Sequence, residues 1–180
     1  MRRLLCIVML TATLAATLVV GGQASAESLI LKNTPVEVYF SPDGGAQDAV
    51  VREIDKARSS ILVFAYSFTS APIGKALVAA HRRGVQVGVI LDREQNTGGR
   101  YTEAMYLKRA RAQVFIDSGE GLQHNKVMVI DSAVVVTGSF NFSKAAEEHN
   151  AENLLVIQSP ELAGMYGANW AAHRKTAEKF

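Results

Sequence analysis

Cysteine is almost absent from the sequence. The 180 residues contain a single cysteine, Cys6, which lies within the first 26 residues. Residues 27–180 therefore cannot form a disulfide, use a cysteine nucleophile or hold a cysteine-ligated zinc or iron–sulfur site. Their stability has to come from a packed core. About 150 residues suffice for one domain that buries roughly 70% of its unfolded surface.

A large charge of either sign is also missing. The formal net charge of +2 comes from 19 Lys and Arg against 17 Asp and Glu. The excess is due to Arg2 and Arg3, the only charged residues before Glu27, so residues 27–180 carry 17 charges of each sign. This balance excludes a globally basic protein that coats DNA through bulk charge. It also excludes an acidic disordered tail.

The first 26 residues have the pattern of a secretory signal peptide. Residues 1–3 give a positively charged start, residues 4–20 are apolar except for three threonines, and Ala24-Ser25-Ala26 matches a small-x-small cleavage site. We predict cleavage after Ala26 and export to the periplasm or the extracellular space. The alternative is an uncleaved anchor, although the apolar run is short for a spanning helix, which needs about 20 residues.

Three common catalytic signatures are missing as well. The sequence has no glycine-rich phosphate loop that ends in Lys-Ser/Thr, no His-Glu-x-x-His and no Gly-x-Ser-x-Gly. The chemistry therefore has to be sought in other residues.

Hydrophobic periodicity predicts alternating strands and helices. Strands are predicted at 36–40, 61–67, 85–91, 113–116, 125–130, 134–137 and 153–157. Helices are predicted at 46–58, 72–83, 101–111 and 160–179. This order indicates the α/β class, with an α-β-α sandwich around a central mixed β-sheet and one domain over residues 27–180.

The most informative segment is residues 124–141, which read His-Asn-Lys-x4-Asp-x6-Gly-Ser-Phe-Asn. Side chains alternate along a strand, so His124 and Lys126 share one face, and Ser139 and Asn141 share a face of the next segment. If the predicted hairpin brings these faces together, three hydrogen-bond donors and a cation converge, which suits phosphate oxygens. The imidazole can also attack phosphorus or transfer a proton near neutral pH.

This spacing resembles the signature of the phospholipase D superfamily, His-x-Lys-x4-Asp-x6-Gly-Ser-x-Asn. The resemblance extends to the β-α-β segments before the motif and to Glu152 after it. The chain is most similar to the small secreted, EDTA-resistant bacterial endonucleases, which carry one motif per chain. The resemblance implies a phospholipase D-like fold and a phosphodiesterase that needs no metal or other cofactor. Because one motif supplies half a site, it also implies a homodimer with the site on the two-fold axis.

The resemblance also implies a role for each residue. His124 of one subunit attacks phosphorus and forms a phosphohistidine, while the partner subunit's His124 protonates the leaving oxygen and then activates water. Lys126 and Asn141 neutralise charge on the phosphoryl oxygens, and Ser139 adds a hydrogen bond. Glu152 orients His124, as the carboxylate of a catalytic triad does.

Several of these residues also have plain structural interpretations. Ser139 and Asn141 are common in turns, and Glu152 could be a surface carboxylate. Asp131 belongs to the signature and is counted with the catalytic candidates, but its parity along the strand is opposite to that of His124, which favours a supporting role. His173-Arg174-Lys175 repeats His-x-Lys without the rest of the signature, so we interpret it as unrelated to the motif.

Three functions remain open at this stage. The first is a nuclease without sequence preference that cleaves DNA, with RNA as an open alternative. The second is a phospholipase D that hydrolyses phospholipid head groups, and the third is a DNA-binding component of a transfer or export system. The mature chain has one tryptophan, Trp170, and no basic amphipathic helix with aromatic anchors. We therefore expect no stable membrane association of the mature form.

Overall fold

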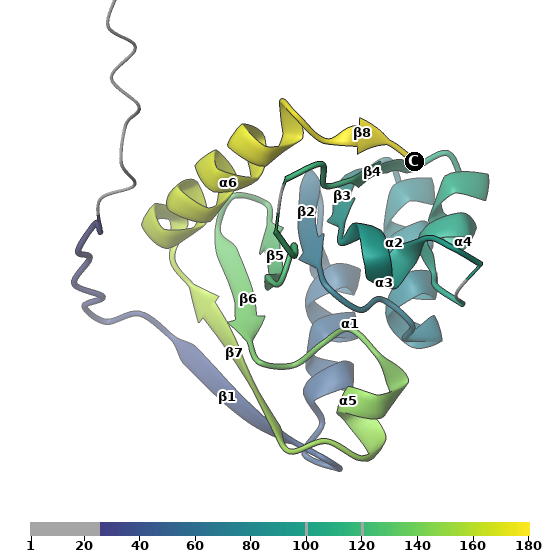
Figure 1. Ribbon diagram of the computed structural model, residues 1–180. Helices are drawn as coiled ribbons and strands as arrows, with labels where there is room; N and C mark the ends of the chain where they lie inside the picture. The colour runs from purple at the N-terminus through teal and green to yellow at the C-terminus, as the bar shows by residue number, and fades with distance from the viewer. Residues whose placement is uncertain (1–25, 100, 120) are drawn as a thin grey trace, which may run out of the picture.

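An eight-stranded mixed β-sheet organises the chain. The computed structural model describes residues 26–99, 101–119 and 121–180, so the predicted signal peptide lies outside the described residues except for Ala26. The strand order is β1-β7-β6-β5-β2-β3-β4-β8 (Figure 1). The strands are β1 (Val36–Ser41), β2 (Ser60–Ala65), β3 (Gln86–Leu91), β4 (Gln113–Ile116), β5 (Lys126–Ile130), β6 (Val134–Gly138), β7 (Glu152–Gln158) and β8 (Glu178–Lys179).

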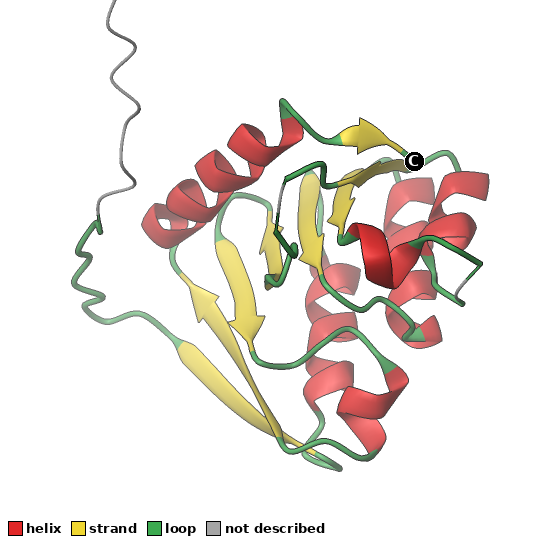
Figure 2. Cartoon of the chain, in the orientation of Figure 1, coloured by secondary structure: helices red, strands yellow, loops and turns green. Residues whose placement is uncertain are grey.

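Helices cover both faces of this sheet (Figure 2). They are α1 (Ala46–Lys56), α2 (Ala71–Arg82), α3 (Arg93–Asn96), α4 (Ala104–Arg109), α5 (Lys144–Glu148) and α6 (Pro160–Arg174). Buried side chains of α1, α2, α4 and α5 form one core with one face of the sheet, whereas α6 packs on the opposite face. The predicted α-β-α sandwich with a central mixed sheet is confirmed.

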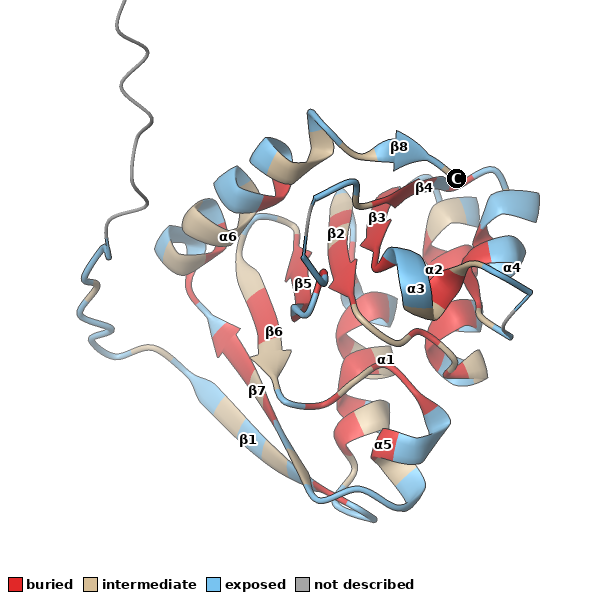
Figure 3. Ribbon diagram, viewed as in Figure 1, coloured by how far each residue is buried: buried red, intermediate tan, exposed pale blue. Residues whose placement is uncertain are grey.

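The parallel part of the sheet is confined to β2, β3 and β4, and every other pair of neighbouring strands is antiparallel. Helix α2 connects β2 to β3. Ser70 caps this helix by accepting a hydrogen bond from the Ile73 N–H, and Pro72 lies in its first turn, where a missing N–H costs nothing. The burial colouring is mostly red along β5, β2 and β3 (Figure 3), as expected for strands covered on both faces.

Helix α6 is fixed to the sheet by Trp170. The indole Nε1 donates a hydrogen bond to the Val63 carbonyl at 3.1 Å. The ring also lies against Gly88, where an added Cβ would come within 2.9 Å of it. A residue without a side chain is therefore required at position 88 for this close approach of helix and sheet.

The C-terminal segment differs from the prediction. The helix predicted over 160–179 ends at Arg174, and Glu178–Lys179 forms β8 against β4. The N–H of Phe180 donates to the Val114 carbonyl at 3.0 Å. A two-residue strand has no periodicity to read, so tertiary pairing decided this element. The short helices α3 and α5 were also not predicted, although Asp92 and Ser143 cap them.

Strand β1 leaves an apolar row uncovered at the sheet edge. Val36, Val38 and Phe40 are 45%, 52% and 65% exposed, because α6 covers β2, β5 and β6 but does not extend over β1 (Figure 1). Within the described residues, no helix is both long and apolar enough to cross a membrane.

Candidate active site

Four strand ends meet at one edge of the sheet. Strand β5 runs antiparallel to both β2 and β6, and β6 runs antiparallel to β7. The carboxyl ends of β2 and β6 therefore lie beside the amino ends of β5 and β7 (Figure 1). This arrangement places Lys126, Gly138 and Glu152 at the same edge although they are distant in sequence.

An open pocket of about 500 Å³ lies at this edge. The residues that line it are His124, Lys126, Gly138, Ser139, Asn141 and Glu152. Five of the six candidate site residues thus surround one space that is open to solvent. Phe140 and Phe142, which alternate with Ser139 and Asn141, are buried in the core, as the strand parity predicts.

His124 presents its imidazole to this pocket. The residue is exposed and lies two positions before the first residue of β5. Its backbone N–H donates to the Leu122 carbonyl at 2.9 Å. The imidazole ring lies beside the Tyr66 ring, with 4.6 Å between the centroids and 59° between the planes. An exposed imidazole fixed on one side leaves its ring nitrogens available for a substrate.

Lys126 is a cation held almost entirely away from water. The residue is 6% exposed, and its Nζ donates to the His124 carbonyl at 2.7 Å. The same ammonium lies 4.8 Å from the centroid of the Tyr66 ring, a cation–π distance. Burial lowers the pKa of Lys126, and the negative charges of Glu152 and Asp92 partly oppose that shift. A desolvated ammonium interacts strongly with a phosphate that enters the pocket.

The remaining polar groups keep hydrogen-bonding capacity free. The Ser139 hydroxyl oxygen accepts from the N–H and the side-chain amide of Asn153, at 3.1 and 3.2 Å, so its own proton can be donated to a ligand. The Asn141 side-chain oxygen accepts a long hydrogen bond of 3.5 Å from the Ser67 N–H, which leaves the Asn141 NH₂ group free to donate.

Gly138 is required by the close approach of two chain segments. Its φ of +154° is one that residues with side chains rarely adopt, and an added Cβ would lie 2.2 Å from the Asn153 carbonyl oxygen. The glycine therefore allows the segment that carries Ser139 to cross directly over β7.

The chain is similar to known proteins over most of its length. Residues 50–173 match the family model described as cardiolipin synthase, PLD-like domain. A relative named phospholipase D, from Rickettsia bellii, is 42% identical over 144 residues, which cover 80% of this chain and 71% of the relative. The chain belongs to the phospholipase D superfamily.

Two solved structures have the same superfamily fold. Nuc from Salmonella typhimurium, a phospholipase D family member, is 39% identical with a TM-score of 0.77, and the match covers 82% of this chain and 99% of that chain. NucT from Helicobacter pylori is 26% identical with a TM-score of 0.76 and coverages of 82% and 100%. The predicted family is therefore confirmed, and the protein is a phosphodiesterase of the phospholipase D superfamily.

Asp131, the aspartate of the superfamily signature, does not reach the pocket. It lies at the far end of β5, about 20 Å along the strand from His124. Its carboxylate accepts hydrogen bonds from the N–H groups of Arg58, Ser59 and Ser60 and from the Ser59 hydroxyl, at 2.8 to 3.0 Å. Its inclusion among the catalytic residues is therefore corrected, because the carboxylate joins β5 to the start of β2.

Asp131→Asn is expected to lower the free energy of unfolding by about 1–2 kcal/mol at pH 7 and to leave kcat unchanged. Asparagine tolerates the positive φ of 52° at this position, so the substitution isolates the charge. Burial raises the pKa of Asp131, but the hydrogen bonds outweigh it and lower the pKa to about 2.

The stabilising contribution of this carboxylate is complete above the unfolded-state pKa of about 3.9 and disappears as the pH falls through about 2. Urea denaturation at pH 7 and pH 2.5 measures both effects, and the two proteins should differ less at the lower pH. A large loss of kcat in folded Asp131→Asn protein would contradict this structural role.

The structure differs from the prediction at two residues of the site, Glu152 and Tyr66. Among the described residues, no hydrogen bond joins Glu152 to His124; instead Glu152 accepts one from the Asn150 side chain at 3.1 Å. The orienting role of Glu152 stays a prediction. Tyr66 was missed, although a polar aromatic residue at the end of the buried strand predicted over 61–67 was the available signal.

The described residues contain no group of three or more His, Cys, Asp or Glu side chains that could hold a metal ion. The positive charge in the pocket is supplied by Lys126. An assay in excess EDTA tests whether turnover needs a metal.

Proposed function

We propose that the protein is an endonuclease that hydrolyses DNA without a metal ion, through a phosphohistidine on His124. The observation that carries this proposal is the exposed imidazole of His124 beside the desolvated ammonium of Lys126 in one open pocket. In the first step a ring nitrogen of His124 bonds to phosphorus, the P–O bond to one nucleoside breaks, and the leaving oxygen takes a proton. In the second step water attacks phosphorus and releases the histidine.

The surface beside the pocket supports a polyanionic chain as the substrate. An open pocket of about 450 Å³ between α2 and α4 is lined by the exposed Tyr101, by a lysine of α2 and by Arg109, together with the Glu103 carboxylate. Thr102, which also lines this pocket, donates a hydrogen bond to the carbonyl of Phe68, and Phe68 forms a β-bridge with Phe142, the residue after Asn141. Aromatic rings and cations in one groove suit unstacked bases and phosphates.

The proposal predicts hydrolysis of DNA in excess EDTA. The mature protein, from Glu27 onward, is incubated with plasmid, single-stranded DNA and RNA in 10-fold excess EDTA over total divalent cations, and products are resolved on gels. We expect cleavage of DNA, with salt weakening it because the contacts are to phosphates. Intact DNA in the presence of folded protein would rule the proposal out. RNA cleavage would extend the substrate range.

A second subunit completes the site in this proposal. The leaving oxygen needs a proton donor and the second step needs a base, and the pocket of one chain contains a single histidine. The partner subunit's His124 takes both tasks in a two-fold homodimer. The apolar row of β1 (Val36, Val38 and Phe40) is an uncovered surface available to such a partner, on a strand that pairs with the Glu152 strand β7.

This dimer model predicts a non-linear loss of activity on mixing. The mature protein should sediment as a dimer at micromolar concentration. Wild-type chains are refolded with an equal amount of His124→Ala chains. Activity should fall to about one quarter of that of the same total amount of wild-type protein, because only dimers with two intact histidines turn over. A fall to one half, or a fully active monomer, would contradict a shared site.

A phospholipase D activity is the second candidate. It is favoured by the name of the Rickettsia bellii relative, phospholipase D, and by the exposed apolar side chains of β1, which could contact a lipid surface. Vesicles of phosphatidylcholine and of cardiolipin, added in parallel with DNA, separate the two functions: release of choline or phosphatidic acid without DNA cleavage supports the lipid substrate.

Export after removal of residues 1–26 remains part of the proposal, and the N-terminal residue of the secreted protein tests it.

A further inference from the structure

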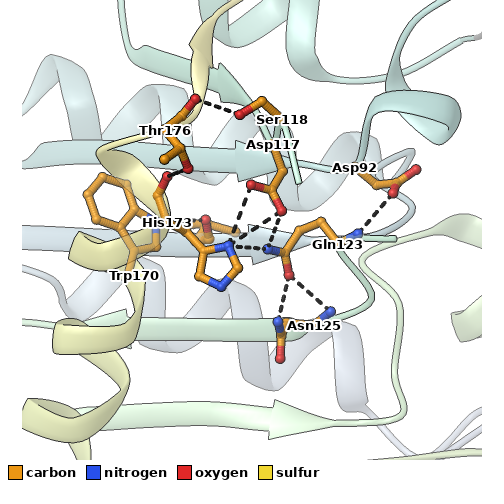
Figure 4. A network of polar contacts seen from close by, with 9 residues as sticks. Asp92, Asp117, Ser118, Gln123, Asn125, Trp170, His173 and Thr176 are labelled. Carbon is orange, nitrogen blue, oxygen red and sulfur yellow. Dashed lines mark hydrogen bonds and ion pairs between the residues drawn. The ribbon is translucent and has the colours of Figure 1, made fainter. Parts of the chain in front are cut away.

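A partly buried polar network connects the C-terminal helix to the segment that carries His124 (Figure 4). His173 comes from the last turn of α6, Asp117 follows β4, and Gln123 immediately precedes His124. The Nδ1 atom of His173 lies 3.4 and 3.5 Å from the two carboxylate oxygens of Asp117. The Gln123 side-chain amide donates to Asp117 Oδ2 at 3.1 Å. His173 thus reaches the active-site segment through the Asp117 carboxylate and through a direct contact of 3.4 Å with the Gln123 amide nitrogen.

The contacts of Gln123 determine how its amide is oriented. Its side chain is buried, at 2% exposure. Its nitrogen faces Asp117, and its oxygen accepts from the N–H and the side-chain amide of Asn125, at 3.3 and 2.6 Å. The Gln123 amide nitrogen also lies 3.4 Å from His173 Nδ1, so Nδ1 either donates to the Asp117 carboxylate or accepts from this amide, and both tautomers keep the three side chains connected.

This arrangement encloses the backbone of His124. The hydrogen bond from the Asn125 N–H to the Gln123 side chain closes a ring that contains the main chain of His124. The N–H of Gln123 is also fixed, because it donates to Asp92 Oδ2 at 3.0 Å. Gln123 and Asn125, on either side of His124, are therefore held by hydrogen bonds to buried groups. Such a local ring restricts the φ and ψ angles of His124.

We propose that His173, Asp117 and Gln123 are positioning residues that set the orientation of the His124 imidazole in the pocket. His173 acts only through Asp117 and Gln123 and does not contact the substrate. The histidine of the repeated His-x-Lys at 173–175 therefore serves the active site through a hydrogen-bond network, although the repeat is not a second motif. The inference rests on the proposed role of His124, because a displaced imidazole lowers the rate only if His124 is the nucleophile.

Helix α6 does not depend on His173 for its attachment. Trp170 donates to the Val63 carbonyl, the Arg174 guanidinium lies 3.5 Å from the centroid of the Phe115 ring, and Ser118 donates to the Thr176 carbonyl at 2.6 Å. A leucine at position 173 can keep the apolar contact that the imidazole makes with Phe64, whose ring centroid is 5.2 Å away. The network can therefore be broken with the fold intact.

The test compares His173→Leu with His173→Asn, in which the side-chain nitrogen occupies the place of Nδ1. The substrate is bis(4-nitrophenyl) phosphate, a small phosphodiester whose binding does not depend on a nucleic-acid surface. For His173→Leu we expect kcat to fall about 10- to 100-fold with KM changed less than about threefold. His173→Asn should recover most of kcat. Lys175→Ala, an exposed change on the same turn, is the matched control and should be unaffected.

A spectroscopic readout keeps the inference separate from the proposed function. The ring of Tyr66 shifts the NMR resonances of the His124 imidazole, so His173→Leu should move these resonances and His173→Asn should restore them. Unchanged resonances, or equal losses of kcat in the leucine and asparagine variants, would overturn the inference. A wild-type protein that hydrolyses no phosphodiester would overturn the proposed function, while the resonances would still decide whether His173 positions His124.

Discussion

His124→Ala is expected to lower kcat for phosphodiester hydrolysis by at least about 10³-fold, with DNA and with bis(4-nitrophenyl) phosphate alike. Loss of a covalent nucleophile typically costs this much or more, and the residual rate comes from binding and charge stabilisation. In the proposed dimer the effect is larger, because one substitution in the gene would remove both the nucleophile and the partner's acid and base. Steady-state kinetics at saturating substrate give kcat directly, and equilibrium binding of DNA should change little.

The matched control is His149→Ala. His149 is exposed beyond the end of α5 and lies 3.7 Å from Glu148, so it shares the chemistry of His124 without its place in the pocket.

Rapid acid quenching of the wild-type enzyme with labelled substrate should trap label on protein in an acid-labile form, and His124→Ala should trap none. Label on the variant, or turnover close to wild type, would exclude His124 as the nucleophile.

Much of this site could be predicted because the signature lies on a hairpin. A fixed spacing of residues on two antiparallel strands also fixes which side chains share a face, so the sequence alone places His124, Lys126, Ser139 and Asn141 together. Asp131 is separated from the pocket because it follows the opposite end of β5, where its carboxylate lies against the start of β2. Local geometry thus accounts for both the members of the pocket and the exception.

The residues that were missed act across distant parts of the chain. Tyr66 lies beside Lys126 only because β2 pairs with β5, and His173 lies beside Gln123 only because α6 returns over the sheet. No periodicity encodes such pairings. The C-terminal helix was extended too far for the same reason, since β8 exists through its pairing with β4. Sequence patterns therefore predict His124 and Lys126 better than the residues that contact them from distant parts of the chain.

The balanced charge of residues 27–180 is consistent with a site that concentrates cations locally. With 17 charges of each sign, residues 27–180 have no bulk attraction for DNA. Lys126 is buried at the pocket, where an incoming phosphate would replace its lost hydration, and the proposed dimer would bring two such lysines to one cleft. Affinity is therefore expected to be modest and sensitive to salt, with most of the electrostatic free energy expressed at the reacting phosphate.

Lys126→Met is expected to lower kcat by about 10²- to 10³-fold while the protein remains folded. The ammonium is desolvated and held by the His124 carbonyl at 2.7 Å, so its charge is in place before the phosphoryl oxygens develop theirs. Methionine fills the same volume. It removes the cost of burying a charge and loses one hydrogen bond, so the free energy of unfolding should change by less than about 1 kcal/mol. A Tm far below that of the wild type would indicate a structural role instead.

The pH profile separates this role from simple packing. Burial lowers the pKa of Lys126, so as the pH rises the ammonium is lost earlier than from an exposed lysine, and kcat should fall on the alkaline side below the ordinary lysine range. In that interval the folded state binds fewer protons than the unfolded state, so stability rises with pH while activity falls. Lys126→Arg should retain part of kcat and lose this alkaline decline, because a guanidinium stays charged. An unchanged alkaline limb in Lys126→Arg would assign the decline to another group.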